Sequence, residues 1–265
     1  MSDDDRLGEL GHFLKDRRAR IGPADAGLAP GPRRRVRGLR REEVASLAGI
    51  GLSWYTALEN GDARGVSKAT LLAVADALRL SESERQYVLD LLERSEVVEP
   101  AGSPDRLVVD TMNALAFPAY IITATWEVVA CNAAFRQIWA VRENELPFNA
   151  VERLFLAPAA RALHGEHFAE NITPVIAMLR SSHGRRPYWG ALRRLRERLM
   201  ADEATRAIWD EYEIRGPLVP NACTIESPIG TFRYEALTLP ISDAGQAIVV
   251  HVPDDASRER LAKLG

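Results

Sequence analysis

Residues 39–61 read LRREEVASLAGIGLSWYTALENG, and this stretch decides the fold of the first part of the chain. Apolar side chains recur at spacings of three and four residues on each side of Gly49, which indicates two short helices. A tight connection between helices needs a positive φ, and glycine accepts one without steric cost. We therefore predict a helix that ends at Gly49, a turn filled by Ile50, and a second helix.

The apolar positions also predict which side chains the two helices bury. Ala45 is small, so the second helix can approach the first closely at this point. The first helix is expected to bury Val44, Leu47 and Ala48. The second helix is expected to bury Tyr55 and Leu58 and to leave on its other faces Ser53, Trp54, Thr56 and Ala57.

Further helical patterns lie on both sides of this pair. The expected helices span residues 7–20, 41–48, 52–60, 68–78 and 81–94. Ser67 and Ser81 are suited to cap the last two helices, and Gly61 to end the helix before them. Five short helices predict an all-α domain over residues 1–99, with a linker of helix-breaking residues at 95–106.

Basic side chains gather ahead of the helix pair. The whole chain has a formal net charge of −3, yet residues 15–41 hold ten Lys and Arg side chains against Asp16 and Asp25. Clustered positive charge, more than the charge of the whole protein, is what a phosphate backbone attracts. The cluster therefore favours nucleic acid as a partner, and a solvated charged loop is the plainer alternative.

The helix pair resembles the helix-turn-helix repressors of the XRE/Cro type. The resemblance rests on Leu58-Glu59-Asn60-Gly61 at the end of the second helix and on Ala45, Gly49 and Ile50 at the expected spacing. It covers about residues 7–94 and includes all five helices. It implies that the second helix enters the major groove of DNA by its N-terminal end.

The resemblance and the charge pattern together name the residues expected to contact DNA. Base-reading positions of the family fall on Leu52, Ser53 and Ala57, and of these only Ser53 has a hydrogen-bonding side chain. We therefore expect the arginine segment, groove shape and dimer spacing to carry more of the specificity. For Trp54, packing against the first helix is an equal alternative. The full expected set is Arg33, Arg34, Arg35, Arg37, Arg40, Arg41, Ser46, Leu52, Ser53, Trp54, Thr56, Ala57 and Lys68.

A different pattern follows the linker. Ala119–Thr123 and Trp126–Cys131 are apolar runs with β-branched residues, which predicts a hairpin. Helices are expected at 132–140 and from about 149 to 213, with interruptions near Pro158, Pro174 and Pro187. Strands are expected at Cys223–Glu226, Thr231–Leu239 and Ala247–Val252. The second half is therefore predicted to be an α+β domain with an antiparallel sheet, over residues 107–253.

The opening of this domain resembles a PAS-type sensor, and the whole domain resembles the ligand-binding domain of MmyB-like regulators. Asn132 follows the hairpin, and its side chain is placed to cap the next helix. The matching stretches are Pro118–Trp139, Arg153–Phe155 with Pro158, Ile208-Trp209 and Phe232–Pro240. The resemblance implies that a small apolar ligand such as a fatty acid binds between the sheet and the helices.

The residues themselves agree with an apolar interior, although a place in the core is the plainer interpretation of any single aromatic side chain. An acyl carboxylate in such an interior needs a basic or hydroxyl partner, and Arg153 and Arg233 are the candidates by sequence neighbourhood. The expected ligand site consists of Tyr120, Ile122, Phe135, Trp139, Arg153, Phe155, Trp209, Phe232 and Arg233.

The sequence gives less support to an enzyme, a metal-binding protein or an adaptor. The chain has no glycine-rich phosphate loop, no Gly-x-Ser-x-Gly elbow and no His-Glu-x-x-His motif, so we expect no enzyme. His164 and His167 lie three residues apart without a third ligand, so neither a metal site nor a cofactor is expected. A helix-turn-helix adaptor or antitoxin is the alternative, and its second domain would bind a protein partner.

Length and composition set the remaining expectations. The chain has 265 residues, 46% of them hydrophobic, and no stretch near the ~18 apolar residues that span a bilayer. Its acidic N-terminus lacks the apolar segment of a secretion signal, and its two cysteines predict buried thiols. We therefore expect a cytoplasmic, ligand-responsive transcription repressor that binds double-stranded DNA as a homodimer and no membrane.

Overall fold

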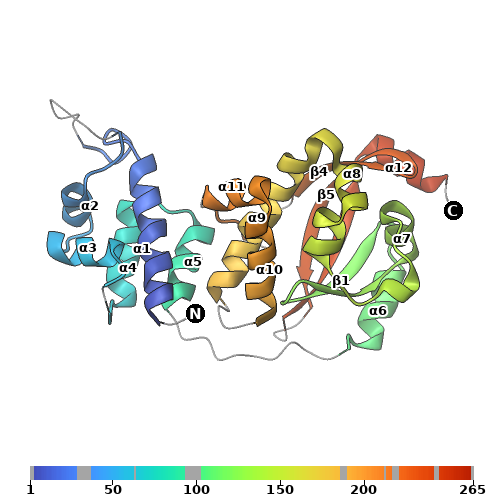
Figure 1. The fold of residues 1–265 in the computed structure, drawn as a ribbon, viewed down its shortest axis with the longest axis horizontal. Helices are drawn as coiled ribbons and strands as arrows, with labels where there is room; N and C mark the ends of the chain where they lie inside the picture. Colours follow the sequence, from blue (N-terminus) through green and yellow to red (C-terminus); the bar gives the residue numbers. More distant parts are fainter. Residues whose placement is uncertain are drawn as a thin grey trace. The chain divides into compact units, whose positions relative to one another are not determined.

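The structure, a computed structural model, describes residues 3–28, 37–62, 64–92, 103–185, 190–211, 213–216, 221–241 and 245–263. The chain divides into two compact units, whose elements are labelled in Figure 1. The first unit holds Met1–Glu96 with His183–Tyr188, and the second holds Val97–Ser182 with Trp189–Gly265. The helical first part and the mixed second part expected from the sequence are both present.

Five helices within residues 3–92 form the fold of the first unit. They are α1 (Asp3–Arg20), α2 (Arg41–Leu47), α3 (Leu52–Glu59), α4 (Lys68–Ala77) and α5 (Glu82–Leu92). Ser67 caps α4 by accepting a hydrogen bond from the N–H of Thr70, as predicted. Ser81 accepts from the N–H of Glu84, whose carboxylate accepts from the N–H of Ser81 in return. Local sequence signals therefore place these helix starts correctly.

The core of the first unit forms around α1. Phe13 is fully buried there and meets Tyr87 of α5 edge to face, with ring centroids 5.1 Å apart. Gly11 lies where a Cβ would collide with the backbone of Glu59, so a glycine is needed for α3 to end this close to α1. Other buried residues of this core are Leu10, Leu14, Leu39, Val44, Tyr55, Leu58, Leu71, Val74, Val88 and Leu91.

One core prediction for the first unit is wrong. Leu47, in the last turn of α2, is 42% exposed. Because α2 has only seven residues, it contacts the other helices over one narrow face, and Val44 and Ala45 are its buried residues. Ala48 and Ile50 are half-buried rather than enclosed. The apolar character of Leu47 thus does not by itself place it in the core.

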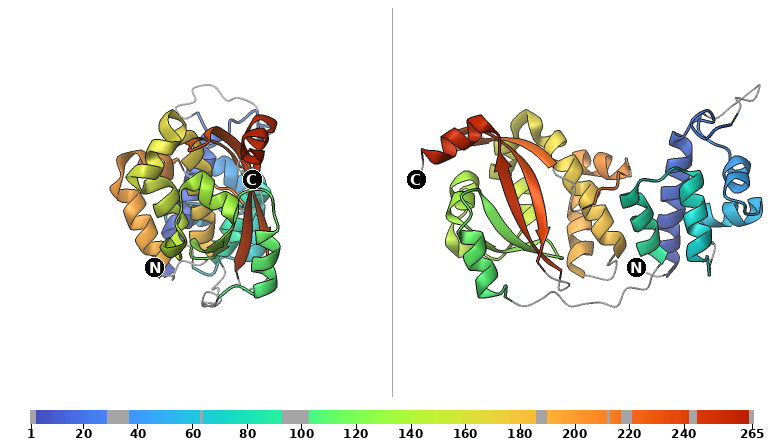
Figure 2. Two further views of the ribbon diagram at one scale, coloured as in Figure 1. Left: turned by 90° about the vertical axis from the view of Figure 1, so that its right-hand side faces the viewer. Right: turned by 180° about the vertical axis from the view of Figure 1, so that it is seen from behind.

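A six-stranded antiparallel sheet forms the frame of the second unit. Its strands are β1 (Ala119–Thr123), β2 (Glu127–Cys131), β3 (Phe148–Asn149), β4 (Asn221–Ser227), β5 (Gly230–Pro240) and β6 (Gln246–Pro253), in the order β3-β2-β1-β6-β5-β4. Figure 2 shows the long strands β5 and β6 side by side. Tyr120 of β1 lies opposite Val249 of β6, so the first hairpin joins the last strand of the chain.

Seven helices accompany this sheet among the described residues. They are α6 (Arg106–Asn113), α7 (Ala133–Trp139), α8 (Pro158–His164), α9 (Phe168–Arg185), α10 (Gly190–Ala201), α11 (Glu203–Asp210) and α12 (Asp255–Ala262). Asn132 caps α7 as predicted, since it accepts from the N–H of Phe135 at 2.9 Å. The same oxygen accepts from the N–H of Ala119, which ties the hairpin to the helix.

Some elements of the second unit were not expected from the sequence. They are α6, β3, a π-helical turn over Glu152–Leu156, and α12. Pro158 starts α8, in agreement with the expected interruption, whereas Pro174 lies inside α9 and does not end it. Most of the predicted linker, and Pro187, lie outside the described residues, and Arg106 already belongs to α6.

The two faces of the sheet carry separate apolar clusters. On one face, β1, β2, β4, β5 and β6 contribute to a large cluster shared with α7 to α11. On the other face, a smaller cluster joins Met112 of α6 to Ile121 of β1 and Val250 of β6. No helix in the part of the chain that the structure describes is long and apolar enough to cross a membrane.

Candidate functional site

The connection between α2 and α3 is a tight turn. Gly49 has a φ of 65°, and the N–H of Ile50 donates to the carbonyl of Ala45 at 2.9 Å, as in a helix end closed by glycine. Tyr55 and Leu58 are buried on the inner side of α3. The turn and these two anchors set α3 at a fixed angle to α2, which is the arrangement of a helix-turn-helix.

The residues expected to read DNA lie on the solvent side of this helix pair. Ser46, Leu52, Ser53, Trp54 and Lys68 are exposed, and Thr56 and Ala57 are half-buried. Leu52, the first residue of α3, is 47% exposed. Gly51 has no side chain to cap α3, and within the described ranges no side chain accepts from the first N–H groups of this helix, a position suited to an anion such as phosphate.

A buried carboxylate fixes the other end of α3. Glu59 has a fully buried side chain, 2.5 Å from Nε of Arg18 and 2.6 Å from Nε of Arg41. Arg18 also donates to the carbonyl of Leu39 at 2.9 Å. Burial alone would raise the pKa of Glu59, but the hydrogen bonds from the two arginines outweigh it and lower the pKa. The ionised carboxylate therefore ties α3 to α1 and to the start of α2.

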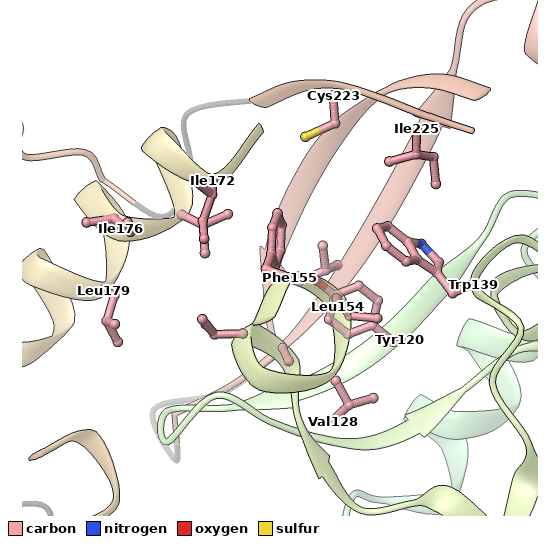
Figure 3. Packing of buried hydrophobic residues seen from close by; sticks show 14 of the residues in the cluster. Tyr120, Val128, Trp139, Leu154, Phe155, Ile172, Ile176, Leu179, Cys223 and Ile225 are labelled. Atoms are coloured by element: carbon pink, nitrogen blue, oxygen red, sulfur yellow. The ribbon is translucent and has the colours of Figure 1, made fainter. Parts of the chain in front are cut away.

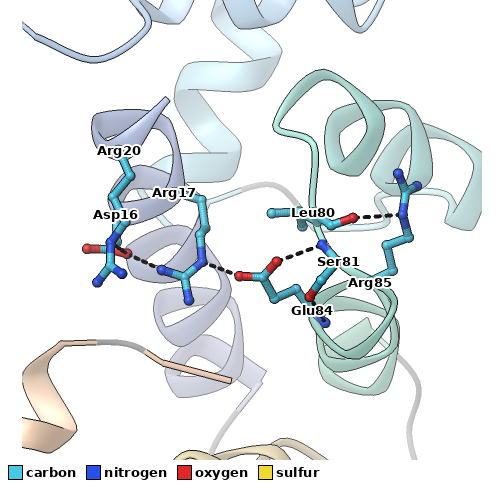
Figure 4. A network of polar contacts seen from close by, with 7 residues as sticks. All are labelled: Asp16, Arg17, Arg20, Leu80, Ser81, Glu84 and Arg85. Carbon is cyan, nitrogen blue, oxygen red and sulfur yellow. Dashed lines mark hydrogen bonds and ion pairs between the residues drawn. The ribbon is translucent and has the colours of Figure 1, made fainter. Parts of the chain in front are cut away.

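Other arginines of the basic segment are also engaged within the first unit. Arg17 is buried and lies 2.6 Å from Glu84 of α5 and 2.8 Å from Asp16 (Figure 4). Arg20 shares the carboxylate of Asp16. Among the described residues of 15–41, the arginines with acidic partners are Arg17, Arg18, Arg20, Arg40 and Arg41. The charge free to meet phosphates is therefore smaller than the sequence count indicates.

The expected arginine contacts thus separate into three groups. Arg33, Arg34 and Arg35 lie outside the described residues. Arg37 is exposed, and no residue in the described ranges pairs with it. Arg40 pairs with exposed Glu42 at 3.3 Å, and Arg41 with buried Glu59. The role of Glu59 was missed because its two partners lie 18 and 41 residues away in sequence.

The aromatic residues expected to line a ligand site do meet in the second unit. One buried cluster holds Tyr120, Phe135, Trp139, Phe155, Trp209 and Phe232, with Ile122 packed against it. Figure 3 shows several of these side chains converging from the sheet, the π-helical turn and the helices. The ring centroids of Tyr120 and Phe135 lie 4.8 Å apart, and those of Phe135 and Trp139 lie 6.2 Å apart.

The two arginines expected at this site do not join the cluster. Phe232 and Tyr234 face the interior, so Arg233 between them is exposed on the opposite face of β5. Arg153 follows Glu152 at the start of the π-helical turn and pairs with Glu145 at 2.7 Å. Closeness in sequence to apolar residues does not place an arginine among them, because side chains alternate between the two faces of a strand, and Arg233 lies on the outer face.

Arg196 of α10 lies half-buried against the Trp209 ring of this cluster, and a different arginine, Arg180 of α9, is fully buried there. It is 1% exposed, and its guanidinium carbon lies 4.4 Å from the centroid of the Trp209 ring. Its Nη2 donates to the carbonyl of Trp209 at 2.5 Å. The sequence signal that could have found Arg180 is its spacing of four residues from Ile176, which places it on the apolar side of α9.

The histidine, tyrosine and cysteine side chains at the cluster are uncharged near neutral pH. His251 stacks on Tyr234 with ring centroids 4.0 Å apart, and its Nδ1 accepts from Nε1 of Trp139 at 3.3 Å. Burial lowers the pKa of His251 to about 3, so the ring is neutral and its proton is on Nε2. Burial also raises the pKa of Tyr120 and brings that of Cys223 to about 11. The cluster thus joins aromatic surface to neutral hydrogen-bonding groups.

His164 and His167 make contacts within the fold of the second unit. His164 is buried at the end of α8, with Nε2 2.8 Å from the carbonyl of Leu154 and Nδ1 2.9 Å from the amide nitrogen of Asn171. His167 lies half-buried in the next turn, 3.5 Å from Glu170. Nowhere in the described ranges do three or more His, Cys, Asp or Glu side chains gather as metal ligands would.

Two sequence families match this chain. Residues 106–264 match the family described as the MmyB-like transcription regulator ligand binding domain. Residues 9–88 match a helix-turn-helix domain. No curated protein matches the chain. The two family matches confirm the helix-turn-helix and MmyB-like resemblances that the motifs indicated.

Proposed function

The chain belongs to the MmyB-like transcription regulators, and from this premise we propose that it is a cytoplasmic repressor that binds DNA as a homodimer and responds to a fatty acid. One observation carries this proposal. The same chain joins a helix-turn-helix with a solvent-facing α3 to a ligand-binding domain with a buried aromatic cluster. The first part supplies the contact to DNA and the second the response to a small molecule.

On the DNA side, α3 is the proposed recognition helix. Leu52 and Ala57 are suited to thymine methyl groups, and Ser53 and Thr56 to base edges that accept or donate a single hydrogen bond. Trp54, Ser46 and Lys68 surround this surface and are proposed to contact phosphates. Among the expected arginines, Arg33, Arg34, Arg35 and Arg37 are proposed to neutralise most phosphates, while Arg40 and Arg41 contribute less because acidic side chains hold them.

On the ligand side, an acyl chain is proposed to pack among the rings of the aromatic cluster. Trp209 belongs to this cluster and also stacks against Arg180, so it links the apolar interior to a buried cation. A carboxylate needs such a charged partner when it leaves water. Arg180 is therefore the proposed anchor for the acid group, in place of Arg153 and Arg233.

Regulation requires that the ligand prefer one of two states of the protein. A dimer binds two half-sites about 34 Å apart, one turn of DNA. A ligand that favours a different arrangement of the two recognition helices therefore weakens operator binding. A coupling of about 1–3 kcal/mol, typical of allosteric proteins, changes operator affinity by about 5- to 150-fold.

The proposal is tested with the full chain and a labelled DNA fragment from upstream of its own gene. Operator affinity is measured by titration with and without each member of a panel of straight-chain fatty acids. We expect at least one fatty acid to lower the affinity at least fivefold. Equal affinities with every fatty acid would contradict the fatty-acid response, and absence of sequence-specific binding would contradict the DNA function.

A pair of matched variants tests the anchor. Arg180→Met removes the buried cation, and Arg153→Met removes an arginine of the same unit that pairs with Glu145. Each variant is titrated with a fatty acid and with the alcohol of equal chain length. We expect Arg180→Met alone to abolish the preference for the acid. Thermal unfolding of both variants checks that they remain folded.

A further inference from the structure

A groove of about 720 Å³ lies in the second unit between α9, residues 213–215 and the cross-strand pair Ala222 and Glu235 of β4 and β5. Glu170, Pro174 and Ala177 line it from α9, and Ala222 and Glu235 line it from the strands. Ala222 and Glu235 alternate with Cys223 and Tyr234, which face the aromatic cluster. The groove therefore lies apart from the proposed fatty-acid site.

The edge of β4 is partly closed by a side chain. β4 is the last strand of the sheet, and Asn171 of α9 hydrogen bonds to it in the manner of a neighbouring strand. The amide nitrogen of Asn171 donates to the carbonyl of Thr224 at 2.6 Å, and the N–H of Thr224 donates to Oδ1 of Asn171 at 3.1 Å. The backbone groups of Thr224 therefore point away from β5.

The same edge is open at Ala222. Antiparallel pairs alternate between those that exchange hydrogen bonds and those that do not, so a residue two positions from Thr224 turns its N–H and C=O to the same side. Ala222 is exposed, and nothing in the described ranges hydrogen bonds to these two groups. An unpaired donor and acceptor on a sheet edge are a template for another extended segment.

The opposite wall of the groove adds an acceptor. Pro174 has no N–H, so the carbonyl of Glu170, four residues earlier in α9, lacks its usual helical donor. Pro174 and Ala177 are buried and form an apolar floor. The groove thus combines an apolar base with backbone groups on both sides, as peptide-binding edges do.

The charged side chains that line the groove determine which peptide segments can bind in it. Among the described residues that line it, Glu170 and Glu235 are acidic, and Glu213 is offset in charge by Arg215. Glu235 is exposed, and the one ion-pair partner of Glu170 among the described residues is the half-buried His167, 3.5 Å away. A strand with acidic side chains is repelled here, and a strand with basic side chains is attracted.

We propose that the edge of β4 at Ala222 binds a short extended segment of a partner protein, added as a strand, whose lysine or arginine side chain lies beside Glu170 and Glu235. A peptide backbone pairs with both the N–H and the C=O of Ala222, which a small amine does not. Asn171 closes the edge at Thr224, so the segment is limited to a few residues. This surface is additional to the DNA and fatty-acid functions.

The test uses the full chain and a fluorescent, capped peptide, Thr-Val-Lys-Val-Thr, with binding followed by anisotropy. Its central lysine is designed to lie opposite Ala222, so that the lysine side chain is on the face of Glu235. One control peptide is N-methylated at the central lysine, and the other carries glutamate in its place. We expect the first peptide to bind and each control to bind at least tenfold more weakly. Equal binding of the N-methylated peptide would overturn strand addition, and no binding of the parent peptide at 1 mM would overturn the site.

Variants locate the site. Ala222→Pro removes the free N–H, which an edge strand tolerates because this group is not used inside the sheet. Glu235→Gln removes a groove charge, and Glu226→Gln removes an exposed glutamate of β4 outside the groove. We expect the first two to weaken peptide binding at least threefold and the third to leave it unchanged. The proposal would be overturned if Glu226→Gln weakened peptide binding as much as Glu235→Gln does. It would also be overturned if spermidine displaced the fluorescent peptide as well as the unlabelled peptide does at the same concentration.

Discussion

The two units bury an ionisable side chain in opposite ways. In the first unit, Glu59 is buried as an anion between Arg18 and Arg41. In the second unit, His251 is buried neutral among Tyr234, Trp139 and other rings. A buried charge is tolerated only with charged, hydrogen-bonded partners, and without them the group gives up its charge. The first unit therefore uses a buried ion pair to hold a helix in place, whereas His251 of the second unit is buried without charge, in the same unit as the buried cation Arg180.

Removing the buried anion is expected to have the largest effect. Glu59→Ala leaves Arg18 and Arg41 without their partner, and breaking a buried pair typically costs about 3–5 kcal/mol. Denaturant unfolding of the full chain, followed in the transition of the first unit, measures this loss. We also expect operator binding to fall beyond what unfolding explains, because the C-terminal end of α3 loses its attachment to α1.

An exposed glutamate of the same domain provides the control for this variant. Glu42 pairs with Arg40 at the surface, so Glu42→Ala is expected to change stability by less than about 1 kcal/mol. A comparable loss for both variants would show that burial does not distinguish the two pairs.

Acidification is expected to weaken the two units in a fixed order. His251 has a folded pKa of about 3 against an ordinary value of 6.5, so below pH 6.5 the unfolded state binds a proton that the folded state does not. The second unit therefore loses about 1.4 kcal/mol of stability per pH unit, or about 2 kcal/mol from pH 6.5 to 5. His164, whose pKa burial also lowers, adds to this loss.

Glu59 responds at lower pH. Its pKa is lowered from 4.5, so its stabilisation is complete above pH 4.5 and is lost as the pH falls towards the folded pKa. Thermal unfolding from pH 7.5 to 4 is expected to show the transition of the second unit moving first. His251→Phe is expected to flatten this dependence, and an unchanged slope would place the titrating group elsewhere.

The two faces of α3 are expected to respond differently to small changes. Ser53→Ala alters the exposed face and is expected to change base preference at one position by about 1 kcal/mol, with stability nearly unchanged. Leu58→Ala alters the buried face and is expected to lower stability by about 2–5 kcal/mol. Binding to a set of single-base operator variants, with unfolding as the control, separates the two. An unchanged preference for Ser53→Ala would mean that α3 docks in another way.

The smallest predicted difference concerns two arginines of one segment. Arg37 is exposed without an acidic partner in the described ranges, while Arg41 is bound to Glu59. Each phosphate contact contributes about 0.9 to the slope of log affinity against log salt. Arg37→Ala is expected to reduce the slope by about that amount, and Arg41→Ala by clearly less. Equal reductions would show that Glu59 releases Arg41 to DNA.

Local signals in the sequence account for most of the secondary structure. The period of apolar residues, the caps Ser67, Ser81 and Asn132, and the turn at Gly49 depend only on nearby residues, so they place α2 to α5, β1, β2 and α7 correctly. Local signals predict the wrong structure where tertiary packing favours a different one. Pro174 stays within α9 because its neighbours Ile172, Val175 and Ile176 are buried, which outweighs one missing hydrogen bond.

The features of the candidate sites also fall into those that local sequence signals predict and those that depend on packing. The exposed positions of α3 and the aromatic cluster follow from helical and strand periods, so both were predicted from the residues. Three features were not predicted from the residues. They are the partners of Glu59, the place of Arg180 beside Trp209 and the outward position of Arg233. Each depends on which elements pack together, and residue spacing carries no information about that.

The sequence by itself determined that this chain has a helix-turn-helix domain and a ligand-binding domain of the MmyB-like type. Only the tertiary structure decided which charges are neutralised, which apolar side chains remain exposed, and where a strand edge is open. The reason is physical: helix caps and turns form between neighbours in the chain, whereas burial and ion pairing are set by elements that meet after the chain has folded.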